Sequence, residues 1–358
     1  IEDSINGIKA GYAAGMKVIH IPDTIEINDD IRRLTSVVCH SLSDVPDIID
    51  TWNEGNVADV EGYYENAMIN CVYVDRVHVK KAFAEYTAAY NADDPKIKLK
   101  IDHTYRVAAL CERIAKAAGM CAYDVELAWL SGMLHDVGRF EQIKRYNTFS
   151  DADSVDHAKF GADLLFKDGL ISTFLNGMVK CTGYKPGALE DRYSSDGVFL
   201  YDRLNKSDME MLELAIRCHN MYRIPQGLNR REQAFCNVLR DADKVDIFKV
   251  NIDTPLEEIY NTTTEELMKS DITDEVLEAF DEEHCILKAI RRTPADTVIG
   301  HVSLAYELVY DESVRITVEQ GYLAKLMHFH SDNEETNRKM AMVREKMDSY
   351  VKKRIGEN

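Results

Sequence analysis

The sequence predicts a mainly α-helical protein with a small α/β segment at its N-terminus. After the turn-rich stretch Asn91-Ala92-Asp93-Asp94-Pro95, apolar residues recur at helical spacing through most of the chain. Before it, a helix of small residues between Glu2 and Met16 leads into residues 17–23, which are typical of a short buried strand. These two patterns indicate different architectures in the two parts of the chain.

Charge and composition exclude several classes of function. The 358 residues carry a formal net charge of −19, which argues against binding a nucleic-acid polymer or an anionic membrane. No apolar run approaches the ~20 residues that span a bilayer. The 8 cysteines form no C-x-x-C pair, which favours a reduced, cytoplasmic protein. A small anionic substrate remains compatible with the sequence wherever basic residues cluster locally.

The N-terminal segment resembles a known enzyme family. Asp3 or Ser4 can cap its helix and Gly15 can end it. An acidic pair followed by such a helix and a hydrophobic strand is similar to the last third of haloacid-dehalogenase-type (HAD) phosphatases and phosphomutases. In that family the acids help to hold magnesium, and Glu2 and Asp3 stand in their place. The resemblance implies a C-terminal HAD-like fragment over residues 1–53. It lacks the family's nucleophilic aspartate, cap domain and phosphate-binding lysine, so its expected role in this chain is structural.

The remaining chain divides by composition into three parts. Residues 54–97 are expected to form a helical linker and residues 98–250 the helical core that carries the chemistry. Residues 251–358 predict acidic helices that cover the site or form a dimer surface, so a homo-oligomer is one expectation. The poorly periodic stretch 180–206 predicts either a lid or a surface loop.

The sequence places polar ionisable residues on apolar helix faces. His103 lies four residues before Val107, and Asp243 lies four after Leu239. His157 and His219 have the same relation to apolar neighbours on their own helices. One such histidine is more often a core residue with a hydrogen-bond partner than a metal ligand.

The adjacent His135 and Asp136 end the apolar stretch from Val125 to Leu134, for which Gly138 is the predicted helix stop. Taken alone, this dipeptide is equally compatible with a metal site and with a capped turn. Five helices that each turn a His or Asp inward are a different case. The free-energy cost of burying all these groups without partners would exceed a domain's stability of ~5–15 kcal/mol. A shared metal centre accounts for all of them.

The order His103…His135-Asp136…Asp243 resembles the HD superfamily of metal-dependent phosphohydrolases, in which the pattern H…HD…D binds one divalent metal. The flanking sequences Leu134-His135-Asp136-Val137-Gly138 and Ala242-Asp243-Lys244-Val245-Asp246 are similar to those of the superfamily. Asp241 and Asp246 compete with Asp243 for the last ligand position, and the A-D-K alignment favours Asp243. The resemblance implies a mainly α-helical HD-domain fold.

Two further histidines extend this resemblance. His157 and His219 look like the additional ligands of two-metal members, which include the HD-GYP cyclic-dinucleotide phosphodiesterases. Asn220 stands where that subgroup has a second consecutive histidine, and the glycine-tyrosine-proline signature is absent. Hydrolysis of cyclic di-GMP is therefore not expected. The expected cofactor is one or two divalent ions, with Mn, Mg, Fe, Co, Ni and Zn not distinguished.

The resemblance implies a hydroxide attack on phosphorus. Asp136 is expected to bind metal and to orient or deprotonate the water. Arg139 can hold a phosphate, and Lys244 adds a cation beside a ligand. The expected substrate is a phosphomonoester or phosphodiester of a small metabolite or nucleotide. The alternatives are a non-hydrolytic nucleotide-sensing module, or an accessory part of a longer HAD phosphatase or phosphomutase.

Overall fold

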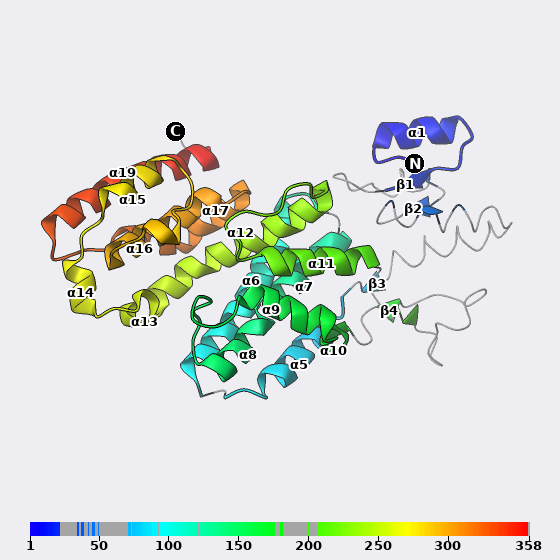
Figure 1. Ribbon diagram of the computed structural model, residues 1–358. Helices are drawn as coiled ribbons and strands as arrows, with labels where there is room; N and C mark the ends of the chain where they lie inside the picture. The colour runs from blue at the N-terminus through cyan, green and yellow to red at the C-terminus, as the bar shows by residue number, and fades with distance from the viewer. Residues whose placement is uncertain are drawn as a thin grey trace.

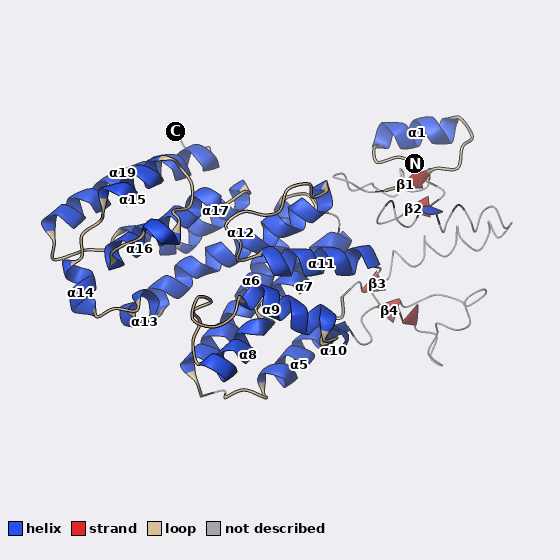
Figure 2. Cartoon of the chain, viewed as in Figure 1, coloured by secondary structure: helices blue, strands red, loops and turns tan. Residues whose placement is uncertain are grey.

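The computed structural model describes residues 1–21, 34–35, 37–38, 42, 45–46, 49, 71–72, 74–91, 93–120, 122–175, 180–181, 199–200 and 206–356. Most of this part of the chain is helical, and its strands are short (Figure 2). The prediction of a mainly helical fold class is confirmed. The fold does not establish that the N-terminal segment is HAD-like.

The N-terminal segment forms a helix followed by a parallel strand pair. Ser4 caps α1 (Ile5–Ala13) by accepting a hydrogen bond from a backbone amide of the first turn. Gly15 has φ = 69°, a conformation that favours glycine, and follows the end of the helix. β1 (Ile19–His20) then pairs in parallel with β2 (Val37–Val38). The predicted helix ends and the short strand are therefore present.

A second small sheet joins distant parts of the chain. The strands β3 (Cys71–Val72), β4 (Lys180–Cys181) and β5 (Phe199–Leu200) pair in antiparallel fashion in that order. Residues 182–198 and 201–205 lie outside the described residues, and with them most of the stretch predicted as a lid or loop. Residues 54–70 of the predicted linker also lie outside them.

The central helices surround one hydrophobic core, which includes Phe83, Leu130, Phe140 and Phe235. Its elements are α5 (Arg76–Thr87), α6 (Pro95–Ala117), α7 (Ala122–Leu134), α8 (Val137–Tyr146), α9 (His157–Ala162), the π-helix η2 (Asp163–Lys167), α10 (Ile171–Leu175), α11 (Lys206–Cys218) and α12 (Arg230–Asp253). Helix α5 and the first turn of α6 fall within the range interpreted as a linker. They pack into the core, since Phe83 is fully buried and the Tyr86 hydroxyl donates to the Val137 carbonyl.

Glycines allow the helices that carry the predicted ligands to approach closely. A Cβ atom on Gly132 of α7 would lie 2.6 Å from the Ala108 Cα of α6. Gly138 was predicted to stop a helix, but it lies inside α8. A Cβ there would lie 2.5 Å from the His157 carbonyl oxygen and 2.7 Å from the Gly161 nitrogen. Gly138 is therefore explained by contact with the backbone of α9 rather than by helix termination.

The C-terminal helices form a second core around Phe248, Phe280, Val298 and Met347. They are α13 (Leu256–Tyr260), α14 (Thr264–Lys269), α15 (Asp274–Asp281), the 3₁₀ turn η4 (Lys288–Ile290), α16 (Pro294–Val302), the 3₁₀ turn η5 (Ser303–Glu307), α17 (Asp311–Gln320), α18 (Tyr322–Met327) and α19 (Glu334–Ile355). None of the helices in the described residues is long and apolar enough to cross a membrane.

Helix α12 connects the two cores (Figure 1). Its first half contributes Phe235 and Leu239 to the central core, and Phe248 near its end belongs to the C-terminal core. Its buried Asp241 accepts hydrogen bonds from the amides of Val309 and Tyr310 in the segment before α17. The C-terminal helices are thereby fixed against the face of α12 that carries Asp241.

Candidate metal centre

The six side chains predicted as metal ligands converge inside the central helices. They are His103 in α6, His135 and Asp136 in the turn after α7, His157 at the start of α9, His219 after α11, and Asp243 in α12. All but Asp243 are almost fully buried, and only 16% of the Asp243 side chain is exposed. Sequence segments that lie far apart thus place four imidazoles and two carboxylates in one small volume.

Two histidines and two aspartates form a first cluster. The Nε2 atom of His103 lies 3.3 Å from Nε2 of His135 and 3.2 Å from Oδ1 of Asp243. Oδ2 of Asp136 lies 3.6 Å and 3.5 Å from the same two imidazole nitrogens. A set of two imidazoles and two carboxylates within this spacing can hold one divalent cation.

A second cluster lies on the other side of Asp136. The Nε2 atoms of His157 and His219 are 3.0 Å apart. Oδ1 of Asp136 lies 3.6 Å from Nε2 of His157 and 3.7 Å from Nε2 of His219. One oxygen of Asp136 therefore faces each histidine pair, so this carboxylate could contribute to a cation held by either pair.

All four histidines are held in the orientation that metal binding requires. Each Nδ1 atom faces an oxygen that accepts a hydrogen bond, so the proton resides on Nδ1 and the Nε2 lone pair faces the centre. The acceptors are Asp246 Oδ2 for His103 (2.6 Å), the Gly132 carbonyl for His135 (2.7 Å), Asp151 Oδ2 for His157 (2.7 Å) and the Ile216 carbonyl for His219 (2.7 Å).

The protonation states of the cluster also suit a cation. Burial lowers the pKa of His157 and of His219 to about 4, so both rings are neutral near pH 7. Burial raises the pKa of Asp136, but Lys100 and the nearby imidazoles outweigh it and hold the pKa well below its usual range. Burial likewise opposes ionisation of Asp243, and the hydrogen bond to His103 reverses that effect and lowers the pKa. Neutral imidazoles and ionised carboxylates are the forms that bind metal.

His103 differs from the other histidines of the site. Burial and the charge of Lys100 lower its pKa, but Asp243 and Asp246 outweigh them, and the pKa is raised. A cation bound between His103 and Asp243 would compete with this proton.

The structure distinguishes Asp241, Asp243 and Asp246, the three candidates for the last ligand position. Asp246 contacts Nδ1 of His103 and accepts two hydrogen bonds from Arg106 at 2.6 Å and 2.9 Å. Asp241 faces away and accepts from the segment before α17. Asp243 alone of the three has an oxygen beside the Nε2 atoms. Asn220 donates to Asp156 at 2.9 Å and lies outside both clusters.

The predicted cations flank the cluster. Arg139 donates through Nη1 to the Phe149 carbonyl and to Asp151, while its buried Nε has no hydrogen-bond partner within the described residues. Nε lies 3.8 Å from Oδ1 of Asp136. Lys244 is 9% exposed and faces the Arg240 carbonyl at 3.4 Å.

Sequence reasoning missed Lys100 and Asp151. The Lys100 ammonium donates to Asp136 at 2.7 Å, and its position three residues before His103 could have indicated a shared helix face. Asp151 orients His157 but lies in an irregular segment, where spacing carries no such signal.

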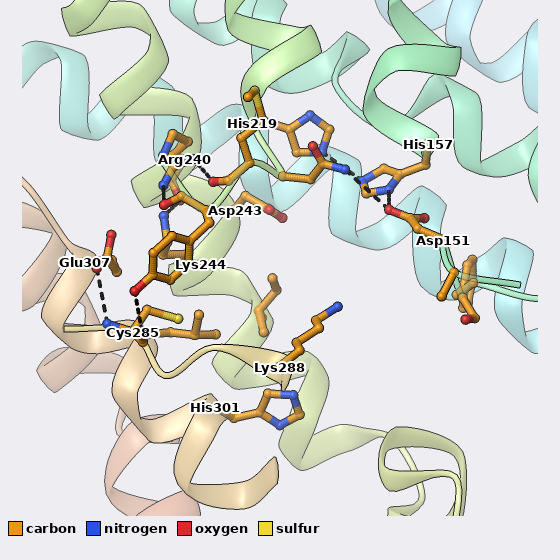
Figure 3. A pocket seen from close by; sticks show the side chains of 18 of the residues that line it. Asp151, His157, His219, Arg240, Asp243, Lys244, Cys285, Lys288, His301 and Glu307 are labelled. Carbon is orange, nitrogen blue, oxygen red and sulfur yellow. Dashed lines mark hydrogen bonds and ion pairs between the residues drawn. The ribbon is translucent and has the colours of Figure 1, made fainter. Parts of the chain in front are cut away.

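A cavity of about 800 Å³ opens beside the clusters. His157, His219 and Asp243 lie on one side, and Lys288 and His301 from the C-terminal part of the chain lie on the other (Figure 3). A volume of this size is typical of pockets for small molecules.

Residues 101–251 match the family described as HD domain. The match supports the assignment of this segment to the HD superfamily, and we refer to the segment below as the HD domain. Members of that family are typically metal-dependent hydrolases, and groups of His and Asp side chains in this HD domain are spaced so that they could hold a metal ion. The match does not extend to residues 1–53, so the HAD-like fragment stays a prediction. No curated protein and no solved structure matches the chain.

The contact between Asp246 and His103 allows a direct test of the candidate metal centre. We expect Asp246→Asn to weaken divalent-metal binding about 10–100-fold, because a carboxylate that fixes a ligating imidazole is replaced by a neutral amide. The measurement is a titration of metal-free protein with Mn²⁺. Asp253→Asn, which changes an exposed carboxylate on the same helix, is the control. Equal Mn²⁺ affinities in the two variants would refute this role.

Proposed function

We propose that the HD domain is a metal-dependent phosphohydrolase that cleaves a phosphomonoester or phosphodiester of a small metabolite or nucleotide. The observation that carries this proposal is the position of Asp136 between two histidine pairs, with one carboxylate oxygen toward each. Two ions about 3.5–4 Å apart that share a carboxylate are a recurrent arrangement for phosphate-ester hydrolysis.

The residues divide into metal ligands and groups for substrate. His103, His135 and Asp243 would hold one ion, His157 and His219 a second, and Asp136 both. A bound divalent ion lowers the pKa of its water and withdraws charge from a phosphoryl oxygen. Asp136 would orient a water at this position and could accept its proton.

Three cations prepare the same site for an anion. Lys100 balances the charge of Asp136, which leaves the carboxylate ionised in a buried place. Arg139 has a buried Nε–H without a partner in the described residues, and a phosphoryl oxygen would satisfy it. Lys244 lines the cavity next to Asp243 and adds a further positive charge for the leaving group.

A substrate screen tests the proposal. The purified chain is incubated with phosphomonoesters and phosphodiesters in the presence of Mn, Mg, Co, Ni, Fe or Zn, and released phosphate or alcohol is measured. Metal-dependent turnover supports hydrolysis. Tight nucleotide binding by calorimetry without turnover under any metal would favour the alternative of a sensing module.

The N-terminal segment supplies a further prediction. Glu2 pairs through its backbone with Ile19 and Ile21. Among the described residues, the groups spaced to hold a metal all lie in the HD domain and include neither Glu2 nor Asp3. We therefore expect the Glu2→Ala/Asp3→Ala double variant to retain wild-type turnover, measured as kcat per folded protein. A selective loss of turnover with unchanged circular dichroism would show that this segment takes part in catalysis.

A further inference from the structure

The cavity has a second wall that the proposed chemistry does not use. This far wall comes from the C-terminal helices and includes Leu287, Lys288, Arg291, His301 and Leu304. It is fixed to the HD domain, because the Tyr222 hydroxyl donates to the Cys285 carbonyl at 2.9 Å. Figure 3 shows Lys288 and His301 across the cavity from His157 and His219.

The far wall carries polar groups without partners in the described part of the chain. Lys288, in η4, is exposed to the cavity and makes no ion pair or hydrogen bond there. The Nε atom of Arg291 and the Nδ1 atom of His301 are both buried and lack hydrogen-bond partners. Buried polar atoms in proteins are nearly always hydrogen-bonded, so these two atoms indicate a missing polar ligand.

The guanidinium of Arg291 is held in place by its surroundings. It donates through Nη2 to the Ile286 carbonyl. A Cβ atom on Gly300 would lie 2.3 Å from the Arg291 Cζ, so the guanidinium occupies space that only glycine leaves free. Lys288 and Arg291 both lie near His301, since after burial their charges lower the pKa of that imidazole further, to about 3. The wall therefore presents two cations around a neutral ring.

Two acidic residues lie near the cations of this cavity, and each also accepts hydrogen bonds from other groups. Glu307 accepts a hydrogen bond from the Cys285 amide and lies close to Lys244, so its charge is matched there. Burial lowers the pKa of Arg291 and the nearby Asp296 raises it, but the oxygens of Asp296 are occupied by hydrogen bonds from Thr273 and from backbone amides of the turn before α16. In a chain with a net charge of −19, a locally positive wall in the cavity is a specific feature.

We propose that the far wall binds a second anionic group of the substrate, a phosphate or a carboxylate, while the scissile phosphate lies at the metal centre. Lys288, Arg291 and His301 receive that group. The side chains of Ile247, Leu287 and Leu304 line the same cavity and suit an apolar portion between the two anions. This inference rests on the proposed function and narrows its substrate class to compounds with anions at both ends.

A series of synthetic ligands tests the distance and the charge together. Alkane-1,ω-diol bisphosphates of increasing length are compared with alkyl monophosphates and with ω-carboxyalkyl phosphates of the same length. Dissociation constants are measured by calorimetry on the Mn²⁺-loaded protein, and KM is measured wherever turnover occurs. The bisphosphate of best length should bind about tenfold more tightly than its monophosphate, as expected for one added charge-assisted contact. The carboxylate arm shows which anion the wall prefers.

Two variants assign the preference to the far wall. Lys288→Ala should lower the ratio of monophosphate to bisphosphate Kd about tenfold. Gly300→Ala keeps every charge but displaces the Arg291 guanidinium, and should lower the ratio as well. Lys353→Ala, an exposed lysine of α19 outside the cavity, should leave the ratio at the wild-type value.

The two proposals can fail separately. Metal-dependent hydrolysis with equal affinity for both ligand types, or a ratio unaffected by Lys288→Ala, would overturn the second-anion site and leave the phosphohydrolase proposal intact. A preference for bisphosphates that depends on Lys288, without turnover of any ester, would support the far-wall site and contradict hydrolysis.

Discussion

Replacing Asp136 by alanine should abolish metal-dependent hydrolysis, with a loss of at least about a thousandfold in kcat/KM. The reason is that this carboxylate places one oxygen beside His103 and His135 and the other beside His157 and His219. Removing this carboxylate affects both proposed ions at once. Metal ions stabilise the charge of the transition state by several kcal/mol, and each 1.36 kcal/mol lost lowers the rate about tenfold. His103→Ala, His135→Ala and Asp243→Ala should also abolish turnover.

The control for this experiment is Asp153→Ala, which removes an exposed carboxylate from the loop near the site. It should keep wild-type activity. Lys100 would be left as an unpaired cation in the Asp136→Ala protein, so folding is checked by thermal unfolding and circular dichroism. Full activity of Asp136→Ala on any substrate from the screen would refute the mechanism.

The second large effect concerns metal content. We expect wild-type protein to bind about two divalent ions per chain, and the His157→Ala/His219→Ala variant to bind about one. The Nε2 atoms of both imidazoles face Oδ1 of Asp136 and lie 3.0 Å from each other. A cation between these three atoms would account for their close approach. Metal per chain is measured by elemental analysis after dialysis against Mn²⁺.

A competing hypothesis assigns these two histidines to the substrate phosphate, beside a single ion. It predicts that metal-replete wild-type protein never exceeds one ion per chain. It also predicts that the double variant keeps that ion and loses substrate affinity. Asp151→Asn, which weakens the anchor of His157 and also the ion pair with Arg139, should give an intermediate occupancy if the two-ion arrangement is right.

The sequence predicted the convergence of ligands because helical periodicity is a local property. The placement of His103 four residues from Val107 and of Asp243 four from Leu239 determined which faces turned inward. Periodicity could not separate Asp243 from Asp246, since residues three apart share a helix face. Only the position of α6 against α12 decides that Asp246 meets Nδ1 of His103 while Asp243 meets Nε2.

Features outside regular helices were not predictable in the same way. Asp151 and the far-wall Lys288 lie in an irregular segment and a 3₁₀ turn, where no period links sequence position to direction. Gly138 illustrates a different failure. Glycine after an apolar run indicates a helix end, but here it reflects the close backbone contact with Gly161, which depends on tertiary packing.

The shared helix α12 has a consequence for how the protein unfolds. The family match ends at residue 251 and includes the buried Asp241. The hydrogen-bond donors to Asp241 lie some seventy residues further along the chain and are the amides of Val309 and Tyr310 and the hydroxyl of Ser313. If the C-terminal helices unfolded alone, the Asp241 carboxyl group, whose pKa is already raised by burial, would lose these hydrogen-bond donors. The buried side chain of Phe248 would also become exposed to water. The end of the family match is therefore not the end of the cooperative unfolding unit. We expect the amide protons of α12 and α17 to exchange with solvent at similar rates, as parts of one unit.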